Sequence, residues 1–430
     1  MSGSLLTTIF ALIFYLTSGI FGGDSGSKSS GLPKTSLSQS SLYPRTGTIS
    51  SKQVNIRSNA STSATIIGAV TQGTQLTVYE EKNGWMLVET PDAKKGWVAK
   101  GLVNTKSVLN AAVGTGKVIA GYYAESSLFD NSGYQALANN LANINTVIPF
   151  SYKVDQYGTI SGKYPTKAAS LAKSGGKNLI ALVNNIQGNN FNSNTIHRML
   201  TSATARSKAV NGILRMLLEN GYRGVNIDFE NVPAKDRLYL TAFFRELAAA
   251  LRPKGLLVTA SVPAKTYDDQ KSDHSGAYNY QGIAPYLDQV IIMAYDEHYA
   301  GGPAGPVASY PWFEKVITYS KRYFPASKIV MGIAGYGYDW SNRSGKARNN
   351  AAIESLIAKY KVTPKWHPTY RVPYFTYRSW GVNHEVWYEN LHSTAAKVNL
   401  VKKHNLRGVA VWRLGYEDPA IWKVIRQTLL

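Results

Sequence analysis

Alternation of apolar and polar residues marks a region near the N-terminus, from about residue 47 to residue 105. The alternating runs there are 53–56, 74–79, 85–90 and 96–99. Turn-forming residues separate them, as at Gly73 and Asn83-Gly84. Several short strands with closely spaced turns favour a small all-β barrel. We therefore predict such a domain over 47–105.

From about residue 115 to the C-terminus, apolar runs alternate with stretches of helical periodicity. The runs are Val118–Tyr122, Thr146–Phe150, Leu179–Val183, Val225–Phe229, Leu257–Val262, Val290–Tyr295, Ile329–Ala334 and Val409–Trp412. Most are rich in Val and Ile, as expected for parallel strands that are buried on both faces. Arg237–Leu251 is a helical stretch between two runs, and its apolar positions are Leu238, Leu240, Phe243, Phe244 and Leu247.

Eight such strand–helix repeats predict an α/β fold, a (β/α)8 TIM barrel over 115–430. The long gap between the last two runs, about 340 to 390, predicts a small inserted α+β element. A short linker over 106–114 would join this barrel to the all-β domain.

The first 23 residues have a different character. Leu5 to Phe21 is predominantly apolar, and no charged side chain precedes Asp24. A run of this length is typical of a signal peptide or of a short membrane anchor. The stretch 24–46, rich in Ser, Gly, Lys and Thr, predicts a flexible linker. We expect an exported protein of the cell envelope, which is either secreted to the wall or attached to the membrane through Leu5–Phe21.

Composition narrows the chemistry. The formal net charge is +21, which favours an anionic partner such as nucleic acid, an anionic membrane surface or an anionic cell-wall polymer. The basic residues form no long run and we find no nucleic-acid-binding motif, so we expect no nucleic acid partner. The absence of Cys excludes thiol catalysis and disulfides. The His residues show no metal-binding spacing, and we expect neither a metal nor an organic cofactor.

The most informative stretch is Gly224–Glu230, on the fourth predicted strand. Side chains alternate across a strand, so Asn226, Asp228 and Glu230 share the face that points into a barrel. Acidic groups in a confined interior lose hydration, which costs several kcal/mol each unless they are partnered. Two such carboxyls at the C-terminal end of a barrel strand are typical of an active site, and their proximity should push their pKa values apart.

This stretch resembles the D-x-x-D-x-D-x-E signature of glycoside hydrolase family 18. Asp228 and Glu230 match its last two acids, whereas Arg223 and Asn226 stand at its first two. The variant Asn-Ile-Asp-Phe-Glu is similar to the cell-wall and spore-cortex branch of that family.

Other motifs agree in order and spacing. Met293–Asp296 resembles the M-x-Y-D motif of the sixth strand, and Trp412 resembles the tryptophan beneath the sugar site. Tyr122-Tyr123 resembles the aromatic pair of the first strand. In the all-β region, Asn83-Gly84-Trp85 and Gly96-Trp97-Val98 resemble the bacterial Src-homology-3-like domain, which implies targeting to wall peptides or glycans.

The resemblance implies a substrate-assisted, retaining glycosidase. Glu230 would be the proton donor and Asp228 would hold the substrate's acetamido nitrogen. Tyr295 would bind the acetamido oxygen, which attacks the anomeric carbon. The expected substrate-binding residues are Trp412, Asp296, Asn226, Tyr122 and Met293.

Three readings of the substrate stay open. We favour an N-acetylglucosaminidase that cleaves β-1,4 bonds in peptidoglycan, of the cell wall or the spore cortex. The first alternative is a chitinase or chitooligosaccharide hydrolase. The second is a non-catalytic carbohydrate-binding protein on the same fold.

Overall fold

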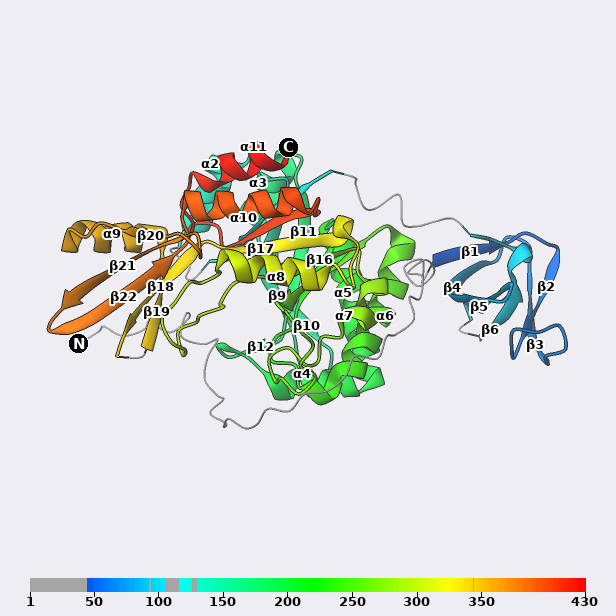
Figure 1. Cartoon of the computed structure of the whole chain (residues 1–430). Helices are drawn as coiled ribbons and strands as arrows, with labels where there is room; N and C mark the ends of the chain where they lie inside the picture. Colours follow the sequence, from blue (N-terminus) through cyan, green and yellow to red (C-terminus); the bar gives the residue numbers. More distant parts are fainter. Residues whose placement is uncertain (1–44, 93, 106–115, 126–129, 343) are drawn as a thin grey trace. The chain divides into compact units, whose positions relative to one another are not determined.

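The computed structural model describes residues 45–92, 94–105, 116–125, 130–342 and 344–430. These residues form two compact units, one within 45–105 and the other from residue 116 to the C-terminus (Figure 1). The expected signal or anchor segment Leu5–Phe21 and the linker 106–114 lie outside the described residues. Within the described ranges, no helix is both long enough and apolar enough to cross a membrane.

The N-terminal unit is a seven-stranded antiparallel sheet with the order β3-β2-β6-β5-β4-β1-β7. Its strands are β1 (Arg45–Ile49), β2 (Gln53–Arg57), β3 (Ile66–Thr71), β4 (Gln75–Lys82), β5 (Trp85–Glu89), β6 (Lys95–Ala99) and β7 (Val103–Thr105). Alternate residues of these strands build its core, for example Val78, Val88 and Val98, each fully buried. The alternating runs therefore predicted four of the strands. They missed β1, β3 and β7; in β3, Ile66 and Ile67 are both exposed, so the strand shows no alternation.

The C-terminal unit is a closed barrel of eight parallel strands, as the sequence predicted. The strands are β8 (Val118–Tyr123), β9 (Thr146–Val154), β11 (Asn178–Asn184), β14 (Gly224–Asp228), β15 (Leu257–Pro263), β16 (Gln289–Met293), β17 (Ile329–Ala334) and β23 (Gly408–Trp412). They pair in chain order, and β8 closes the barrel by pairing with both β23 and β9. A short strand, β10 (Ile160–Gly162), pairs antiparallel with β9.

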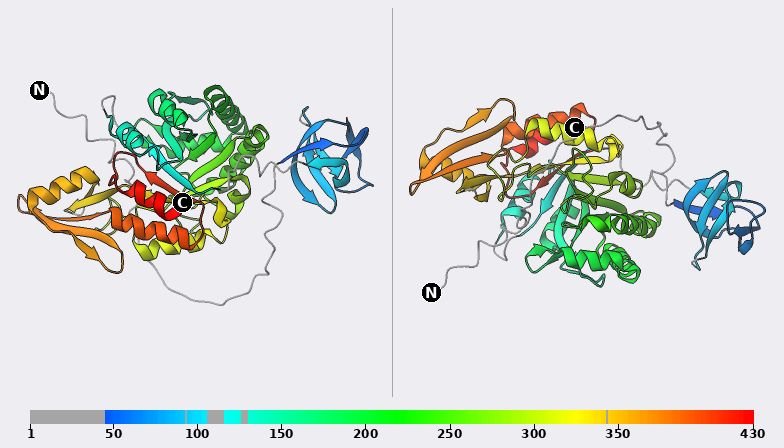
Figure 2. Two further views of the ribbon diagram at one scale, coloured as in Figure 1. Left: turned by 90° about the horizontal axis from the view of Figure 1, so that it is seen from above. Right: turned by 60° about the horizontal axis from the view of Figure 1, so that its bottom comes forward.

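Helices cover the outside of the barrel, as Figure 2 shows in two further views. They are α2 (Ser132–Asn140), α3 (Thr166–Ser174), α4 (Ser193–Thr201), α5 (Ala203–Asn220), α6 (Arg237–Leu251), α7 (Tyr280–Ile283), α8 (Tyr310–Ser320), α10 (Leu391–Lys403) and α11 (Ile421–Leu429). Helix α6 has the predicted bounds, and its residues Leu240, Phe243, Phe244 and Leu247 are buried. Leu238 is the exception, because 76% of its surface is exposed.

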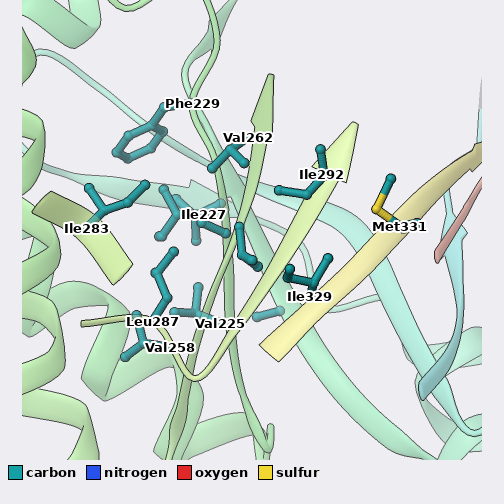
Figure 3. Close-up of a cluster of buried hydrophobic side chains, with 14 of the residues drawn as sticks. Val225, Ile227, Phe229, Val258, Val262, Ile283, Leu287, Ile292, Ile329 and Met331 are labelled. Carbon is teal, nitrogen blue, oxygen red and sulfur yellow. The ribbon is translucent and has the colours of Figure 1, made fainter. Parts of the chain in front are cut away.

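Two apolar layers hold the barrel together. The larger lies between strands and helices, and it includes the outward residues Val225, Ile227 and Phe229 of β14. Figure 3 shows these three side chains near Ile283 and Leu287. The smaller layer fills the barrel interior, and among the described residues every barrel strand contributes to it except β14. The inward face of β14 therefore differs from the inward faces of the other seven strands, because it contributes no residue to this apolar layer.

The chain between β17 and α10 forms the predicted α+β insertion, which extends from one side of the barrel (Figure 1). Its five-stranded antiparallel sheet has the order β19-β18-β22-β21-β20, and α9 packs on it. The elements are β18 (Tyr336–Ser341), β19 (Ser344–Asn349), α9 (Asn350–Tyr360), β20 (Lys365–His367), β21 (Val372–Ser379) and β22 (Val382–Tyr388). Tyr336, Tyr338 and Trp340 of β18 line one face of this sheet and pack toward the barrel mouth.

Candidate active site

The inward face of β14 carries polar side chains where the other strands carry apolar ones. Asn226 is fully buried and Asp228 is 5% exposed. In the neighbouring strand β15, Thr259 stands opposite Asn226, and Ser261 follows on the same face. The barrel interior thus has a polar sector formed by two adjacent strands.

A chain of hydrogen bonds organises this sector. The Ser261 hydroxyl donates to Asn226 Oδ1 at 2.8 Å, and Asn226 Nδ2 donates to Thr259 Oγ1 at 3.2 Å. The Tyr122 and Ser261 hydroxyls lie 2.8 Å apart. Burial raises the pKa of Asp228 to about 7, and the nearby Ser261 side chain partly opposes that shift. Asp228 can therefore hold or lose a proton near neutrality.

Glu230 lies two residues beyond Asp228, just past the end of β14, and is partly exposed. Burial is the largest cause that raises its pKa well above the usual value, and the charges on Asp228 and Asp296 add to it. Like charges in one site disfavour further ionisation, so the last proton is held tightly. A carboxyl that stays protonated at neutral pH can act as a general acid.

Asp296 and Tyr295 come from the loop that follows β16. Asp296 adopts a left-handed conformation with φ 61°, and it accepts hydrogen bonds from Tyr336 at 2.7 Å and Tyr338 at 3.0 Å. Burial raises its pKa to about 6, although the two hydroxyls lower it. The Tyr295 ring occupies space that Gly332 of β17 leaves, because a Cβ at residue 332 would lie 2.9 Å from Tyr295 Cε1.

Trp412 ends the last barrel strand and is partly exposed. Its ring meets Tyr122 and Phe150 edge-on, with ring centres 5.4 Å away in each case. It also packs on the aromatic face of the insertion. An aromatic ring held in this way presents a flat surface at the barrel mouth, where a sugar can stack.

The structure separates the predicted site residues into two groups. Those with accessible surface are Glu230, Tyr295, Asp296, Met293 and Trp412. Asp228, Tyr122 and Asn226 are buried, and Asn226 has no exposed surface. The expectation that Asn226 contacts a substrate does not fit this placement, because both ends of its amide are engaged by Thr259 and Ser261. We interpret Asn226 and Tyr122 as supports beneath Asp228.

Several residues near the site escaped the sequence analysis. Ser261 could have been found, because the alternation in Leu257–Pro263 places it on the same inward face as Thr259. Asn185 and Tyr278 contact the backbone around Glu230 from other segments, and Tyr336 and Tyr338 reach Asp296 from the insertion. No spacing in the chain points to these contacts, because they depend on how distant segments pack.

Two further features concern metal binding and a cavity outside the predicted site. Within the described ranges, no group of three or more His, Asp or Glu side chains could hold a metal ion. A cavity of about 1000 Å³ lies on the insertion beside Gly301–Ala304, lined in part by Trp340, Arg378 and Glu385. None of the predicted site residues lines this cavity.

Models of two known families match this chain. The model described as glycosyl hydrolases family 18 matches residues 118–417, which is more than half of the chain. The chain belongs to glycosyl hydrolases family 18. It is therefore a glycosidase, and the predicted acids of β14 lie within the matched region. The model of the bacterial SH3 domain matches residues 52–104.

Curated relatives and solved structures agree with this family. An uncharacterized glycosylase of Bacillus subtilis, YvbX, is 32% identical over 304 residues, which cover 69% of this chain and 88% of that protein. The cortical fragment-lytic enzyme of Bacillus anthracis is 30% identical over 305 residues, covering 68% of this chain and 70% of that protein.

Among solved structures, the Bacillus cereus spore cortex-lytic enzyme SleL has a TM-score of 0.68 and 28% identity, over 73% of this chain and 75% of that chain. A chitinase from Chromobacterium violaceum also has a TM-score of 0.68, with 31% identity over 73% of this chain and 99% of that chain.

Proposed function

We propose that this glycosidase cleaves β-1,4 bonds at N-acetylglucosamine in peptidoglycan by a substrate-assisted, retaining mechanism. The observation that carries the proposal is the pair Asp228 and Glu230 at the mouth of the barrel. Glu230 has a strongly raised pKa and accessible surface, whereas Asp228 is nearly buried beneath it. The two carboxyls have different surroundings and therefore suit different roles.

In the first step, Glu230 protonates the glycosidic oxygen of the leaving sugar. The carbonyl oxygen of the substrate's own 2-acetamido group attacks the anomeric carbon, so no protein nucleophile is required. The ring that forms is a positively charged oxazolinium ion. Asp228 binds the acetamido nitrogen and stabilises that charge, and the Tyr295 hydroxyl orients the acetamido oxygen.

In the second step, Glu230, now ionised, takes a proton from a water molecule that attacks the anomeric carbon. Attack on the face opposite to the acetamido oxygen opens the ring and gives net retention. Trp412 supports the sugar from below, and Asp296 lies beside it with its carboxyl held by two tyrosine hydroxyls. The same carboxyl of Glu230 thus serves as acid and then as base.

Three observations favour peptidoglycan as the polymer. Two relatives are named for the lysis of cortical fragments and of the spore cortex, and we take that cortex to be the kind of peptidoglycan this chain cleaves. The bacterial SH3 domain supports targeting to the wall, and the net charge of +21 suits anionic wall polymers. This reading implies export, with Leu5–Phe21 as the leader or the anchor.

A chitooligosaccharide is the second candidate substrate. The Chromobacterium violaceum chitinase, at 31% identity over 99% of its length, supports it. Chitin and peptidoglycan share the N-acetylglucosamine unit that the mechanism requires, so the catalytic residues would be the same for both.

The test uses the full chain and its Glu230→Gln variant, each incubated with purified peptidoglycan and separately with chitooligosaccharides. Mass spectrometry of the new reducing ends identifies the products. We expect muropeptides that end in N-acetylglucosamine, formed by the wild type and reduced at least about 10³-fold in the variant.

Cleavage of chitooligosaccharides alone would move the assignment to a chitinase. If neither substrate yields products while the protein still binds insoluble wall, the chain acts as a carbohydrate-binding protein and the proposed reaction is wrong.

A further inference from the structure

The backbone of Glu230 is held by a side chain from a neighbouring strand end. The Glu230 N–H donates to Asn185 Oδ1 at 2.9 Å, and Asn185 Nδ2 donates to the Glu230 carbonyl oxygen at 2.9 Å. Asn185 directly follows β11 and is fully buried. One amide group therefore satisfies both backbone polar groups of Glu230.

Strand register explains why a side chain is needed there. The parallel pairing of β11 with β14 ends at Asn184 opposite Asp228, and the pairing of β14 with β15 ends at Ile227. Glu230 lies beyond both ladders, and the next residue, Asn231, turns away in a left-handed conformation with φ 53°. The Asn185 amide makes hydrogen bonds to the Glu230 backbone where the backbone pairing of β11 with β14 has ended.

A second side chain holds the preceding residue. The Tyr278 hydroxyl donates to the carbonyl oxygen of Phe229, and Tyr278 is 1% exposed. The segment that carries it is anchored in turn, because Lys265 Nζ donates to the Tyr278 carbonyl oxygen at 2.7 Å and to Asp268 at 2.8 Å. Both hydrogen bonds of the peptide unit 229–230 therefore end on buried groups from other segments.

We propose that Asn185 and Tyr278 are positioning residues that fix the carboxyl of Glu230 by clamping its backbone. The inference rests on the proposed function, in which Glu230 is the acid. A displacement of about 1 Å in a reacting group can reduce a rate by roughly 10²-fold, so the effect of the clamp on the rate should exceed what its three hydrogen bonds alone would give.

The clamp also controls the proton on Glu230. The ionisable groups that act on this carboxyl or lie around it are Asp228 on its own strand, Asp296 after β16, and the tyrosines Tyr122, Tyr278 and Tyr295. Loss of the clamp lets the carboxyl move away from the two acids and toward water. Both changes lower its pKa, so the alkaline limb of the pH–rate profile shifts to lower pH.

The chain offers a matched control for Asn185. Asn145 makes the same kind of clamp at the opposite end of the barrel, where its Oδ1 accepts from Ile119 N–H at 3.0 Å and its Nδ2 donates to the Lys117 carbonyl at 2.8 Å. Replacement of either asparagine by alanine removes these two hydrogen bonds and one more, which Asn185 donates to the Asn192 carbonyl and Asn145 accepts from the Thr146 hydroxyl. Only the change at residue 185 touches the backbone of Glu230.

Tyr278 has a control as well. Tyr280 is 2% exposed, and its hydroxyl donates to the Pro263 carbonyl oxygen at 2.5 Å. Tyr278→Phe and Tyr280→Phe therefore each remove one buried hydroxyl that binds a backbone carbonyl in the same region. Only Tyr278→Phe removes the hydrogen bond to the Phe229 carbonyl oxygen.

The experiment measures kcat, KM and the pH–rate profile of the full chain on a soluble N-acetylglucosamine oligomer. We expect kcat to fall about 10²-fold in Asn185→Ala and about tenfold in Tyr278→Phe, with KM changed less than about threefold. The alkaline limb should move to lower pH in both. Asn145→Ala and Tyr280→Phe should keep kcat within about threefold and leave that limb in place.

Equal kcat values and equal pH profiles within each pair would overturn the proposal. If Asn185→Ala does not fold, the tyrosine pair decides alone. Glu230→Gln distinguishes this failure from that of the proposed function. If that variant loses activity while both pairs behave alike, the clamp is wrong and the acid stands, whereas full activity in Glu230→Gln removes the basis of both.

Discussion

Buried aspartates occur in the insertion and in the barrel, and they have opposite surroundings. In the insertion, Asp339 is 3% exposed, pairs with Arg348 at 3.0 Å and with His384 at 2.8 Å, and accepts from Tyr377 at 2.9 Å. In the barrel, the buried Asp228 lies beside the Ser261 hydroxyl, and the partly exposed Asp296 receives two tyrosine hydroxyls. Among the residues that the structure describes, neither Asp228, Glu230 nor Asp296 forms an ion pair with Lys, Arg or His.

Two other buried acids, Asp288 and Glu389, follow the pattern of the insertion, whereas buried Glu417 is held by the Trp422 indole and the Tyr416 N–H. Asp288 pairs with Arg252 at 3.0 Å and Glu389 pairs with Lys397 at 2.7 Å, with all four side chains at most 5% exposed. A buried charge is costly unless it is paired, so pairing is the structural solution. The acids of the barrel mouth have no such pair, and burial, together with the charges on Asp228 and Asp296 in the case of Glu230, raises their pKa values. We propose that this difference separates paired acids that stabilise the fold from the acids that carry out the proposed reaction.

Replacing aspartate by asparagine at residue 228 in the barrel and at residue 339 in the insertion should have different effects. Asp228→Asn removes the charge that would stabilise the oxazolinium ion, so we expect kcat to fall about 10²- to 10³-fold. The barrel should nevertheless stay folded, since the amide is similar in size and carries no charge to bury. Steady-state kinetics on a soluble N-acetylglucosamine oligomer, with circular dichroism as the folding control, tests both parts. Retention of wild-type kcat would contradict the role given to Asp228.

Stability should change with pH in a defined direction. Burial raises the pKa of Asp228 to about 7, so above pH 7 the wild type bears an ionised buried carboxyl that Asp228→Asn lacks. The variant should therefore be more stable at pH 8, by about 4 kcal/mol. That gain should shrink between pH 7 and pH 4, where the wild-type carboxyl becomes protonated. A lower melting temperature for the variant at pH 8 would show that Asp228 is compensated after all.

The matched change in the insertion should have the opposite effect. Asp339→Asn leaves Arg348 and His384 without their buried anionic partner, so we expect a loss of about 2 kcal/mol in the free energy of unfolding. The rate at 25 °C should stay within about threefold of the wild type, because Asp339 does not touch the site. Denaturant unfolding and kinetics on the same preparations test it. A large rate loss with unchanged stability would show that the comparison fails.

The sequence predicted the barrel well because its signal is repetitive. Eight apolar runs correspond to the eight strands, and the alternation in Gly224–Glu230 placed Asp228 on the inward face and Glu230 beside it. The strand ends were less accurate, since β14 stops at Asp228 and β16 stops at Met293. Glu230 and Asp296 lie past those ends, where the ladders give way to loops.

The surroundings of the acids were not predictable in the same way. Asn185, Tyr278 and Tyr336 reach the site from three loops or strands that are far apart in the chain, and no periodicity relates them. The unpaired state of Asp228 was equally hidden, because the sequence contains enough Lys and Arg to pair every acid. Which acids receive a partner is decided by tertiary packing.

The protonation state of Glu230 at neutral pH tests the central claim most directly. Infrared difference spectroscopy of the full chain, wild type minus Glu230→Gln, detects the carbonyl stretch of a protonated carboxyl at pH 7. We expect that band in the wild type, its loss in the variant, and its disappearance as the pH rises through the alkaline limb of the rate profile. If the difference spectrum at pH 7 shows only an ionised carboxylate, then burial and the nearby Asp228 and Asp296 do not keep Glu230 protonated. That result would contradict the role of Glu230 as the general acid.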